Sequence, residues 1–256
     1  MRRNLAKQRL REGKAILGVH IPFPAPAVVE LAAAAGFHWV LIDCEHGPMN
    51  HETVESMIRA AECTDITPIV RPPRNEAPAI LRYLDMGAQG IFVPNIDSRA
   101  DAEAAVRHAK FHPAGRRGLG PYGRWARQRP GGTPLPEFVR QANEEIMVTL
   151  LVESVQGVEC LDEILGVEGV DEIHLGLADL SQSLGRPGDV GSPEVLACTT
   201  QALAKILRAG RTAGMGAASP ERVRQFLDQG VRSVLVGADM LFVDAGRRFV
   251  NEAGID

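Results

Sequence analysis

The sequence predicts a closed (β/α)8 barrel in a single domain, and two observations lead to that fold class. A short apolar run, a polar end and a helical stretch stopped by glycine follow one another about eight times in 256 residues. This alternation is typical of parallel α/β folds. The composition does not change from one unit to the next, so eight units favour a closed barrel over an open sheet.

The first four units fit the pattern in chain order. Their strands and helices are expected at 15–21 with 25–35, 39–43 with a helix through 54–61, 68–71 with a helix through 80–84, and 90–94 with 99–110. Val54, Met57 and Ile58 have the spacing of one helical face. Gly36 and Gly87 follow the ends of two of these helices, as C-terminal glycines commonly do.

The last four units continue in the same way. They are expected at 147–153 with 158–165, 172–179 with 193–209, 215–218 with a helix through 223–227, and 233–238 with a helix that begins near 240. Ser219 and Pro220 predict an N-cap followed by the first helical position. The one long interruption, 111–145, follows the fourth unit, and we interpret it as an insertion with a helix near 136–143.

The composition excludes several classes of protein. Apolar residues make up 45% and charged residues 23% of the chain, and the net charge is −4, so no basic surface for nucleic acid is expected. The sequence contains no run of roughly 18 apolar residues, so no membrane contact is expected. The four cysteines lack zinc-binding spacing and indicate reduced thiols in a cytoplasmic protein. Prolines interrupt the apolar stretch after the basic N-terminus, which disfavours a signal peptide.

Polar residues are concentrated where the predicted strands end. These residues are Asp43, Glu45, His46, Arg71, Glu153 and Asp179. The C-terminal strand ends of a barrel meet at one mouth, where barrel enzymes have their active sites. Each residue alone fits a helix cap or a surface ion pair, but a shared mouth favours a catalytic site.

Glu153 and Asp179 are the predicted metal ligands. Neighbouring strands lie roughly 4.8 Å apart, so these two carboxylates can reach one ion. Carboxylates without nearby Cys or His suit Mg²⁺ or Mn²⁺. The alternative is a pair of solvated carboxylates at the rim.

Arg71 and His46 suit the chemistry of an enolate. The planar guanidinium of Arg71 fits a carboxylate or an enolate oxygen, or a salt bridge to Asp43. His46 can transfer a proton near neutral pH, with Asp43 or Glu45 as the carboxylate that fixes its tautomer. All four lysines (Lys7, Lys14, Lys110 and Lys205) lie away from strand ends, which leaves a Schiff-base mechanism without a nucleophile.

Two other motifs are assigned no catalytic role. Residues 118–123 match the GxGxxG pattern but follow Arg116 and Arg117 instead of a strand, so a basic lid over the barrel mouth is favoured over a dinucleotide site. Cys44 adjoins the strand-end acid but is expected to be a packed thiol.

These residues resemble the HpcH/HpaI family of metal-dependent aldolases that use pyruvate. The resemblance covers about 15–249 and is carried by LIDCEHGP (41–48), VRPPRNE (70–76), LDMGAQGIFVPNIDS (84–98), HPAGRRGLGPYG (112–123), LLVES (150–154) and GLADLSQSLG (176–185). It implies a barrel, a homohexamer built as a trimer of dimers, and aldol chemistry with pyruvate and an aldehyde. A divalent metal (Mg²⁺, Mn²⁺ or Co²⁺) is the expected cofactor, with no organic cofactor.

The resemblance also implies roles for individual residues. Glu153 and Asp179 match the metal ligands, His46 and Asp43 match the base dyad, and Arg71 matches the residue that holds pyruvate and steadies the enolate. The remaining matches are Asp85, an acid presented near a subunit interface, and the backbone of Leu177, Ala178 and Asp179, which grips the pyruvate carboxylate.

Three positions depart from the family pattern and concern the acceptor aldehyde. Many relatives have Trp at His20, several have Gln or Met at Leu151, and some have a bulkier residue at Gly216. We expect His20 and Gly216 to contact the acceptor, and His20 to favour an aldehyde with polar groups. Two other functions remain open: a CoA-ester lyase of the citrate-lyase β-subunit type that uses Arg116 and Arg117, and a non-catalytic ligand-binding barrel.

Overall fold

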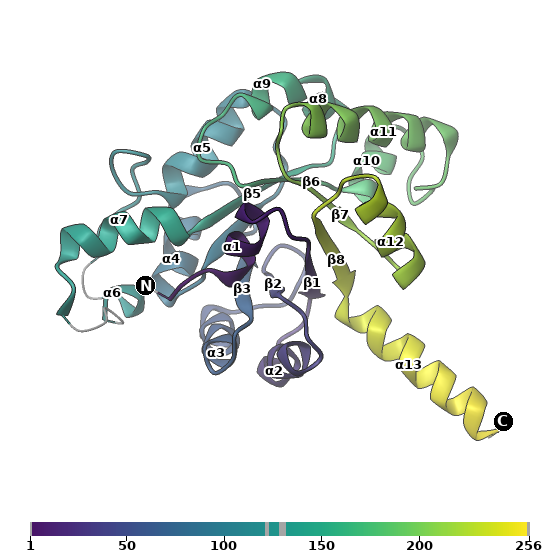
Figure 1. Cartoon of the computed structure of the whole chain (residues 1–256), viewed down its shortest axis with the longest axis horizontal. Coiled ribbons are helices and arrows are strands. Elements are labelled where there is room, and N and C mark those ends of the chain that lie inside the picture. Colours follow the sequence, from purple (N-terminus) through teal and green to yellow (C-terminus); the bar gives the residue numbers. More distant parts are fainter. Residues whose placement is uncertain (1, 121–122, 128–131, 255–256) are drawn as a thin grey trace.

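The computed structural model describes residues 2–120, 123–127 and 132–254, and it confirms the barrel. Eight parallel strands pair in chain order, and β8 closes on β1 (Figure 1). The strands are β1 (Ile16–Ile21), β2 (Trp39–Asp43), β3 (Thr67–Arg71), β4 (Gly90–Val93), β5 (Met147–Val152), β6 (Glu172–Leu175), β7 (Ala213–Gly216) and β8 (Ser233–Gly237).

Helices surround the barrel. In the described residues they are α1 (Leu5–Arg11), α2 (Pro26–Ala34), α3 (His51–Glu62), α4 (Ala77–Met86), α5 (Arg99–Ala109), α6 (Arg124–Arg127), α7 (Leu135–Glu145), α8 (Val155–Glu159), α9 (Leu161–Leu165), α10 (Leu177–Ser183), α11 (Pro193–Arg208), α12 (Pro220–Asp228) and α13 (Ala238–Ala253). None of them combines the length and the apolar character needed to cross a membrane.

Strand alternation decides which side chains fill the barrel. Ile16, Trp39, Leu41, Phe92 and Leu151 form an inner apolar cluster, separate from the larger core between the strands and the helices. The inner cluster fills the centre, and the pocket that opens above it lies at the C-terminal strand ends. That is the end at which barrel sites form.

The expected strand at 172–179 was too long. β6 ends at Leu175, and Gly176 caps α10, whose first turn contains Leu177, Ala178 and Asp179. The barrel interior leaves no room for a side chain at Gly176, because a Cβ there would lie 2.7 Å from the Cβ of Glu153. Asp179 therefore reaches the mouth from the start of a helix and not from a strand end.

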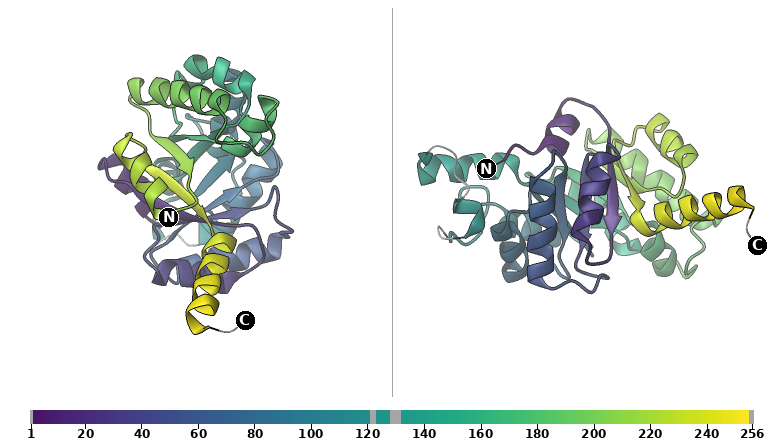
Figure 2. Two further views of the ribbon diagram at one scale, coloured as in Figure 1. Left: turned by 90° about the vertical axis from the view of Figure 1, so that its right-hand side faces the viewer. Right: turned by 90° about the horizontal axis from the view of Figure 1, so that it is seen from below.

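Helix α13 leaves the barrel instead of covering it. Figures 1 and 2 show it projecting from the body with the C-terminus at its far end. Only Ala238, its first residue, is buried. Phe242 and Phe249 are 80% and 75% exposed, unusual values for large apolar side chains.

The segment 111–145 does not form a lid over the chain's own mouth in its described part. Gly118 lies over Leu81, and Gly120 faces Asp85, so the loop packs along the outside of α4. The expected helix is α7, whose Phe138 and Ala142 enter the outer core. Part of the GxGxxG stretch, residues 121–122, lies outside the described residues.

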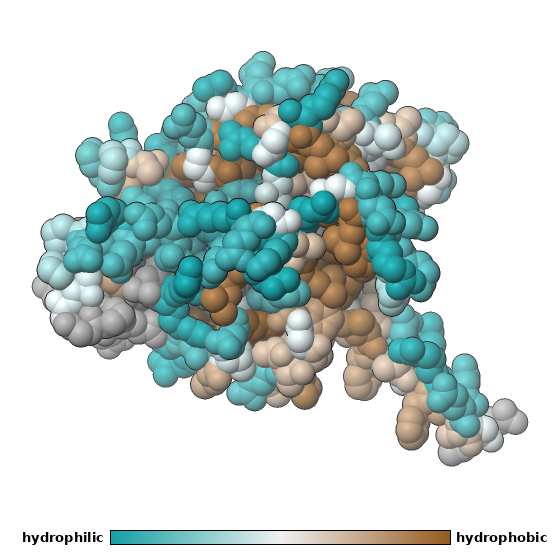
Figure 3. All heavy atoms as spheres, viewed as in Figure 1, coloured by the Kyte–Doolittle hydropathy of each residue, from teal (hydrophilic) through white to brown (hydrophobic). Residues whose placement is uncertain are grey.

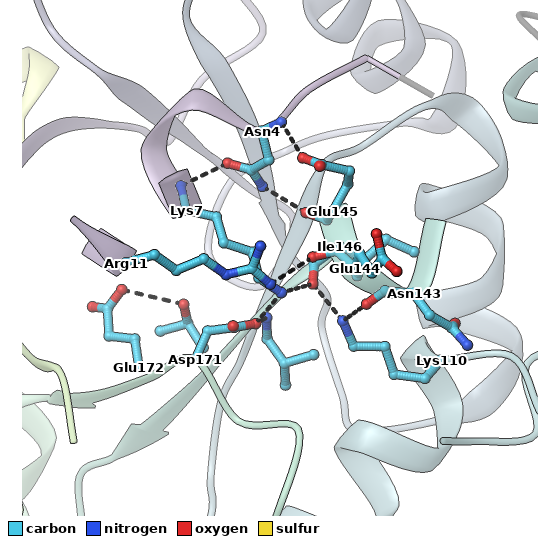
Figure 4. Close-up of polar contacts among 12 residues, drawn as sticks. Asn4, Lys7, Arg11, Lys110, Asn143, Glu144, Glu145, Ile146, Asp171 and Glu172 are labelled. Atoms are coloured by element: carbon cyan, nitrogen blue, oxygen red, sulfur yellow. Dashed lines mark hydrogen bonds and ion pairs between the residues drawn. The ribbon is translucent and has the colours of Figure 1, made fainter. Parts of the chain in front are cut away.

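The N-terminal segment closes the opposite end of the barrel through polar contacts (Figure 4). Lys7 on α1 donates from Nζ to the carbonyl of Ile146 at 2.8 Å and to Asp171 Oδ2 at 2.9 Å. Lys110 donates to the carbonyls of Ile146 and Asn143. Both lysines are buried here, far from the strand ends where substrate would bind.

Lys110 should make the stability of the protein depend on pH. Burial and the neighbouring charge of Lys7 lower the pKa of Lys110 to about 7. The unfolded chain then binds more protons than the folded chain between pH ~7 and ~10.4, so stability should rise with pH in that window. We expect Lys110→Met to remove this slope of up to about 1.4 kcal/mol per pH unit.

Urea unfolding of wild type and Lys110→Met between pH 6.5 and 9.5 measures the difference. The exposed Lys14→Met is the matched control and should leave the slope unchanged. Parallel stability curves for wild type and Lys110→Met would show that Lys110 stays charged across the window.

Candidate active site

The buried carboxylate of Asp43 is the centre of the candidate site. Arg71, its register partner on β3, donates from Nε to Oδ1 at 2.8 Å and from Nη2 to Oδ2 at 2.6 Å. His20 on β1 places Nε2 at 2.9 Å from Oδ2. The backbone N–H groups of Glu45 and His46 also donate to Oδ1. Asp43 therefore fixes the positions of both Arg71 and His20.

These contacts keep Asp43 ionised. Burial would raise its pKa, but the hydrogen bonds with His20 and Arg71, together with the charge of Arg71, hold the pKa of Asp43 well below its usual range. Burial acts against the charged form of Arg71 as well, yet Asp43, Glu45 and Glu153 raise the pKa of Arg71 above its ordinary value. The site thus contains a permanent, fixed positive charge.

The family resemblance implies a base dyad in which the ring of His46 contacts Asp43, and the structure does not show this contact. Only the backbone N–H of His46 contacts Asp43, while its side chain is 67% exposed and its Nε2 lies 3.9 Å from Glu45 Oε2. The turn explains this. A Cβ on Gly47 would lie 2.4 Å from the carbonyl oxygen of Asp43, so the chain folds back tightly and directs residue 46 outward.

The ring that does contact Asp43 belongs to His20. Strand parity could have identified it, because Ile16, Gly18 and His20 share the inward face of β1. The sequence indicated that His20 lies at the mouth but not that it pairs with the acid. Cys44 faces the outer core, and burial raises the pKa of its thiol to about 11, consistent with a packed thiol.

Glu153 and Asp179 meet on the other side of the mouth. Glu153 follows β5 directly and is 7% exposed. Burial raises the pKa of Glu153, and the nearby Asp179 and Glu45 carboxylates raise it further. The hydrogen bond from the backbone N–H of Asn95 acts in the opposite direction and lowers it. Carboxylates this close repel one another unless a cation or a proton lies between them.

Asn95 is a site residue that the sequence analysis missed. It follows β4 and has a positive φ of 56°, which is uncommon outside glycine. In this conformation its backbone N–H donates to Glu153 Oε1 at 3.0 Å, and its Nδ2 donates to Glu45 Oε1 at 3.3 Å. The signal in the sequence was an Asn two positions after the end of a strand, a residue type that tolerates this backbone region.

The donor set fits a hard divalent cation. Glu153 and Asp179 offer carboxylate oxygens, the ligands that Mg²⁺ and Mn²⁺ prefer. In the described ranges, no group of three or more His, Cys, Asp and Glu side chains surrounds one metal position. Water or substrate oxygens would therefore have to complete the coordination.

A pocket of about 560 Å³ connects these groups. Of the residues singled out in the sequence, those that line it are His20, Arg71, Leu151, Glu153, Leu177, Ala178, Asp179 and Gly216. Asp43 lies beneath the surface and acts on the pocket through Arg71 and His20. Among the described residues no lysine lines it, as the sequence predicted.

Asp85 lies outside the pocket, at the end of α4. It accepts a hydrogen bond from Nη2 of the buried Arg117 at 2.6 Å. Burial raises the pKa of Asp85, although Arg117 opposes the shift. Within one chain Asp85 cannot contact the substrate, so a role in catalysis requires another copy of the chain.

A (β/α)8 barrel with a clamped arginine, two facing carboxylates and, among its described residues, no lysine at its mouth is typical of a carbon–carbon lyase of the metal-dependent aldolase class. The chain belongs to the HpcH/HpaI aldolase/citrate lyase family, whose model matches residues 17–244. This confirms the family predicted from the sequence motifs.

Relatives of known activity support the class. The chain is 38% identical over 240 residues to the hydroxypyruvate/pyruvate aldolase of Pseudomonas aeruginosa, covering 92% of this chain and 87% of that one. It is 35% identical over 247 residues to the 2-keto-3-deoxy-L-rhamnonate aldolase of Escherichia coli K12, covering 94% and 90%. A family member from Burkholderia cenocepacia superposes with a TM-score of 0.90 at 33% identity, covering 98% and 99%.

Proposed function

We propose that the chain catalyses the reversible aldol cleavage of a 4-hydroxy-2-oxo acid to pyruvate, or a close analogue, and an aldehyde. The observation that carries the proposal is the arrangement of Arg71 opposite Glu153 and Asp179 in one pocket without a lysine. The similar aldolases act on hydroxypyruvate, pyruvate or a 2-keto-3-deoxy acid, as their names state. All of these are 2-oxo acids.

Glu153 and Asp179 would hold the divalent cation, with Mg²⁺, Mn²⁺ and Co²⁺ as candidates. Such an ion, when bound, polarises the carbonyl group and stabilises negative charge on its oxygen. Arg71 donates to the same oxygen or to the carboxylate, and its fixed geometry requires no reorganisation during the reaction. The backbone N–H groups of Leu177 and Ala178 lie in the first turn of α10 and suit the substrate carboxylate.

We assign the proton transfer to the His20–Asp43 pair. Asp43 holds the His20 ring at the edge of the pocket, so the ring is oriented to take a proton from the substrate. His46, the base that the family resemblance implies, is the competing candidate, because its exposed ring lies beside Glu45 at the same rim.

Two alanine variants should separate these histidines. We expect His20→Ala to reduce kcat at least ~100-fold, the usual loss for a general base, with little change in the Kd for pyruvate. His46→Ala should cost less than ~10-fold. Steady-state kinetics of pyruvate release, with pyruvate binding measured by calorimetry, give both values. The reverse ranking would return the proton transfer to His46.

The acceptor aldehyde would contact the outer part of the pocket. His20 uses Nε2 for Asp43, which leaves Nδ1 as the ring atom able to contact a polar acceptor. Gly216 at the end of β7 leaves open space, since a Cβ there would meet only the carbonyl of Leu235 at 3.9 Å. We therefore propose that Gly216 admits a large acceptor and that His20 favours a polar one.

The CoA-ester lyase reading is disfavoured. It relied on Arg116 and Arg117 as ligands for CoA phosphates. Arg117 is instead buried, with its guanidinium on Asp85 and 4.6 Å above the ring centre of Phe111. Pyruvate release from a set of 4-hydroxy-2-oxo acids tests the aldolase proposal, and turnover of malyl-CoA in place of all of them would overturn it.

We propose that the protein is a homo-oligomer in which α13 packs on a second copy. Helix α13 exposes Phe242, Phe249 and Val250, and Figure 3 shows apolar surface along one side of it. Between α13 and the body, a groove of about 690 Å³ is lined by Leu17, Phe37, Val223 and Val236 of the barrel and by Met240 and Leu241 of α13 itself. The groove is therefore suited to the corresponding helix of another copy. The hexamer implied by the family resemblance is our specific expectation.

Charged residues on the apolar side of α13 should dissociate this assembly. We expect Phe242→Lys/Phe249→Lys to form a smaller oligomer than wild type, because burying two lysines in an apolar groove has a large free-energy cost. Glu252→Lys on the same helix is the control. Light scattering coupled to size exclusion measures the mass, and an unchanged mass for the double variant would exclude α13 from the interface.

We also propose a cytoplasmic location. Cys44, Cys63, Cys160 and Cys198 are all free of disulfides, which fits a reducing compartment. Thiol titration in denaturant, on protein purified without reductant, would contradict this if fewer than four thiols react.

A further inference from the structure

A buried ionisable pair that the proposed mechanism does not use lies directly beneath the substrate pocket. Glu172 and His174 are consecutive inward-facing residues of β6, 1% and 3% exposed. His174 Nδ1 lies 2.9 Å from Glu172 Oε1, and Thr149 on β5 donates from Oγ1 to Glu172 Oε2. The desolvation cost of burying such a pair in the centre of a barrel can exceed the gain from the attraction between its members, so the pair calls for a functional explanation.

The barrel is shaped to accommodate this pair. Gly214 is the register partner of His174 on β7, and a Cβ at that position would lie 1.9 Å from Glu172 Oε1 and 2.3 Å from His174 Nδ1. No side chain larger than glycine fits without moving the pair. Phe92 packs edge-on to the imidazole with ring centres 4.9 Å apart, which fixes the plane of the ring.

The ring presents one nitrogen to the substrate pocket. His174 lines the pocket, whereas Glu172 lies one pleat deeper and does not. Because Glu172 occupies Nδ1, Nε2 points away from it, and no residue in the described part of the chain hydrogen-bonds to Nε2. A carboxylate oxygen accepts from Nδ1–H, so the neutral ring offers Nε2 as a hydrogen-bond acceptor. Nε2 is therefore matched to a hydroxyl group on the ligand.

The position of His174 indicates which part of the substrate it meets. Arg71, Glu153 and Asp179 lie at the strand ends and would hold the carboxylate and keto oxygens of the 2-oxo acid. The aldehyde must enter and leave from the mouth, above that acid. His174 lies one pleat below, among Leu41, Phe92, Leu151 and Leu235, which form the floor of the pocket. The floor therefore faces the 2-oxo acid donor and not the acceptor aldehyde.

We propose that His174, oriented by Glu172, is a specificity-determining residue that accepts a hydrogen bond from a hydroxyl on carbon 3 of the donor. The preferred donor is then a 3-hydroxylated 2-oxo acid. This rests on the proposed aldolase function. In the condensation, carbon 3 loses a proton to the base, a bond forms between carbon 3 and the aldehyde carbon, and the aldehyde oxygen gains a proton. The product is a 3,4-dihydroxy-2-oxo acid, and cleavage is the reverse.

The test compares donors that differ only at carbon 3. With one aldehyde, we expect wild type with Mg²⁺ or Mn²⁺ to favour 3-hydroxypyruvate over pyruvate by at least ~10-fold in kcat/KM, because pyruvate leaves Nε2 without its partner. His174→Phe should reduce the ratio of the two values to within ~2-fold of unity. Comparing ratios across variants removes the intrinsic reactivity of each donor.

Two further variants separate recognition from packing. Glu172→Gln leaves the pocket lining intact but can reverse the hydrogen bond at Nδ1, so it should lower the donor ratio as well; a His174 that only fills space would not respond. The double variant Glu172→Val/His174→Phe removes both polar partners together and avoids leaving Glu172 buried alone. His51→Phe on the outside of α3 is the matched control and should keep the wild-type ratio.

Calorimetric titration of each donor without aldehyde gives an independent measure of binding. Tighter binding of 3-hydroxypyruvate to wild type, lost in His174→Phe, supports the proposal. Equal donor ratios in wild type and all His174 and Glu172 variants, or a wild type that prefers pyruvate, would overturn it. No turnover with any donor would instead contradict the aldolase function, while the titration would still decide whether His174 recognises the hydroxyl.

Discussion

Exhaustive chelation of divalent metal should abolish aldol cleavage, and added Mg²⁺, Mn²⁺ or Co²⁺ should restore it. Carbon–carbon cleavage leaves a carbanion that needs an electron sink, supplied by either a lysine imine or a metal. The four lysines cannot supply the imine: Lys7 and Lys110 close the far end of the barrel, Lys14 is exposed, and Lys205 on α11 pairs with Asp162. A contribution of several kcal/mol corresponds to a loss of at least ~1,000-fold.

Variants of the two ligands make this prediction specific. Glu153→Gln and Asp179→Asn should each lose the metal-dependent rise in melting temperature together with turnover, because an amide is a poorer ligand for a hard cation. Glu159→Gln on α8, outside the pocket, should keep both. Full activity after chelation, or a borohydride-trapped pyruvate adduct on a lysine, would contradict metal dependence.

The sequence was sufficient for the parts of the fold that repeat. Each strand had an apolar run and each long helix an apolar face, and both signals are local. The end of β6 was misplaced because Gly176 continues the apolar run, while the start of α10 depends on the crowding of Gly176 against Glu153, which is a tertiary contact. The direction in which α13 leaves the barrel could not be predicted from the sequence either, since its amphipathic pattern is the same whether it packs on its own barrel or on another copy.

The residues of the candidate site likewise fall into those that the sequence predicts and those that depend on tertiary contacts. Strand ends gave Asp43, Arg71 and Glu153, because the position after an apolar run is visible in the sequence. The partner of Asp43 was assigned to His46 by proximity and by family resemblance, but the tight turn at Gly47 directs that ring outward. His20 lies 23 positions before Asp43, and only barrel closure brings them together. The role of Asn95 depends on one backbone conformation, which an Asn after a strand tolerates but does not require.

Replacing Asp43 by Asn should impair turnover and stability together, because one carboxylate orients both Arg71 and His20. We expect Asp43→Asn to lower kcat at least ~100-fold, since His20 loses the carboxylate that orients its ring for proton transfer. Arg71 would keep its charge in a buried site with a neutral partner, and breaking a buried pair in this way typically costs on the order of 3 kcal/mol.

The loss of stability in Asp43→Asn should depend on pH with a defined sign. The pKa of Asp43 in the folded protein lies well below the value of about 3.9 for an unfolded aspartate, so its ionised form stabilises the fold. That contribution is fully present above pH ~4 and decreases as the pH falls further toward the folded pKa. The gap between wild type and Asp43→Asn in urea unfolding should therefore be constant from pH 8 to 5 and shrink below about pH 4. Asp65→Asn, an exposed carboxylate, is the control. A gap that already shrinks between pH 7 and 5 would mean that Asp43 is not held ionised by Arg71 and His20, and the assignment of the His20–Asp43 pair to proton transfer would fail with it.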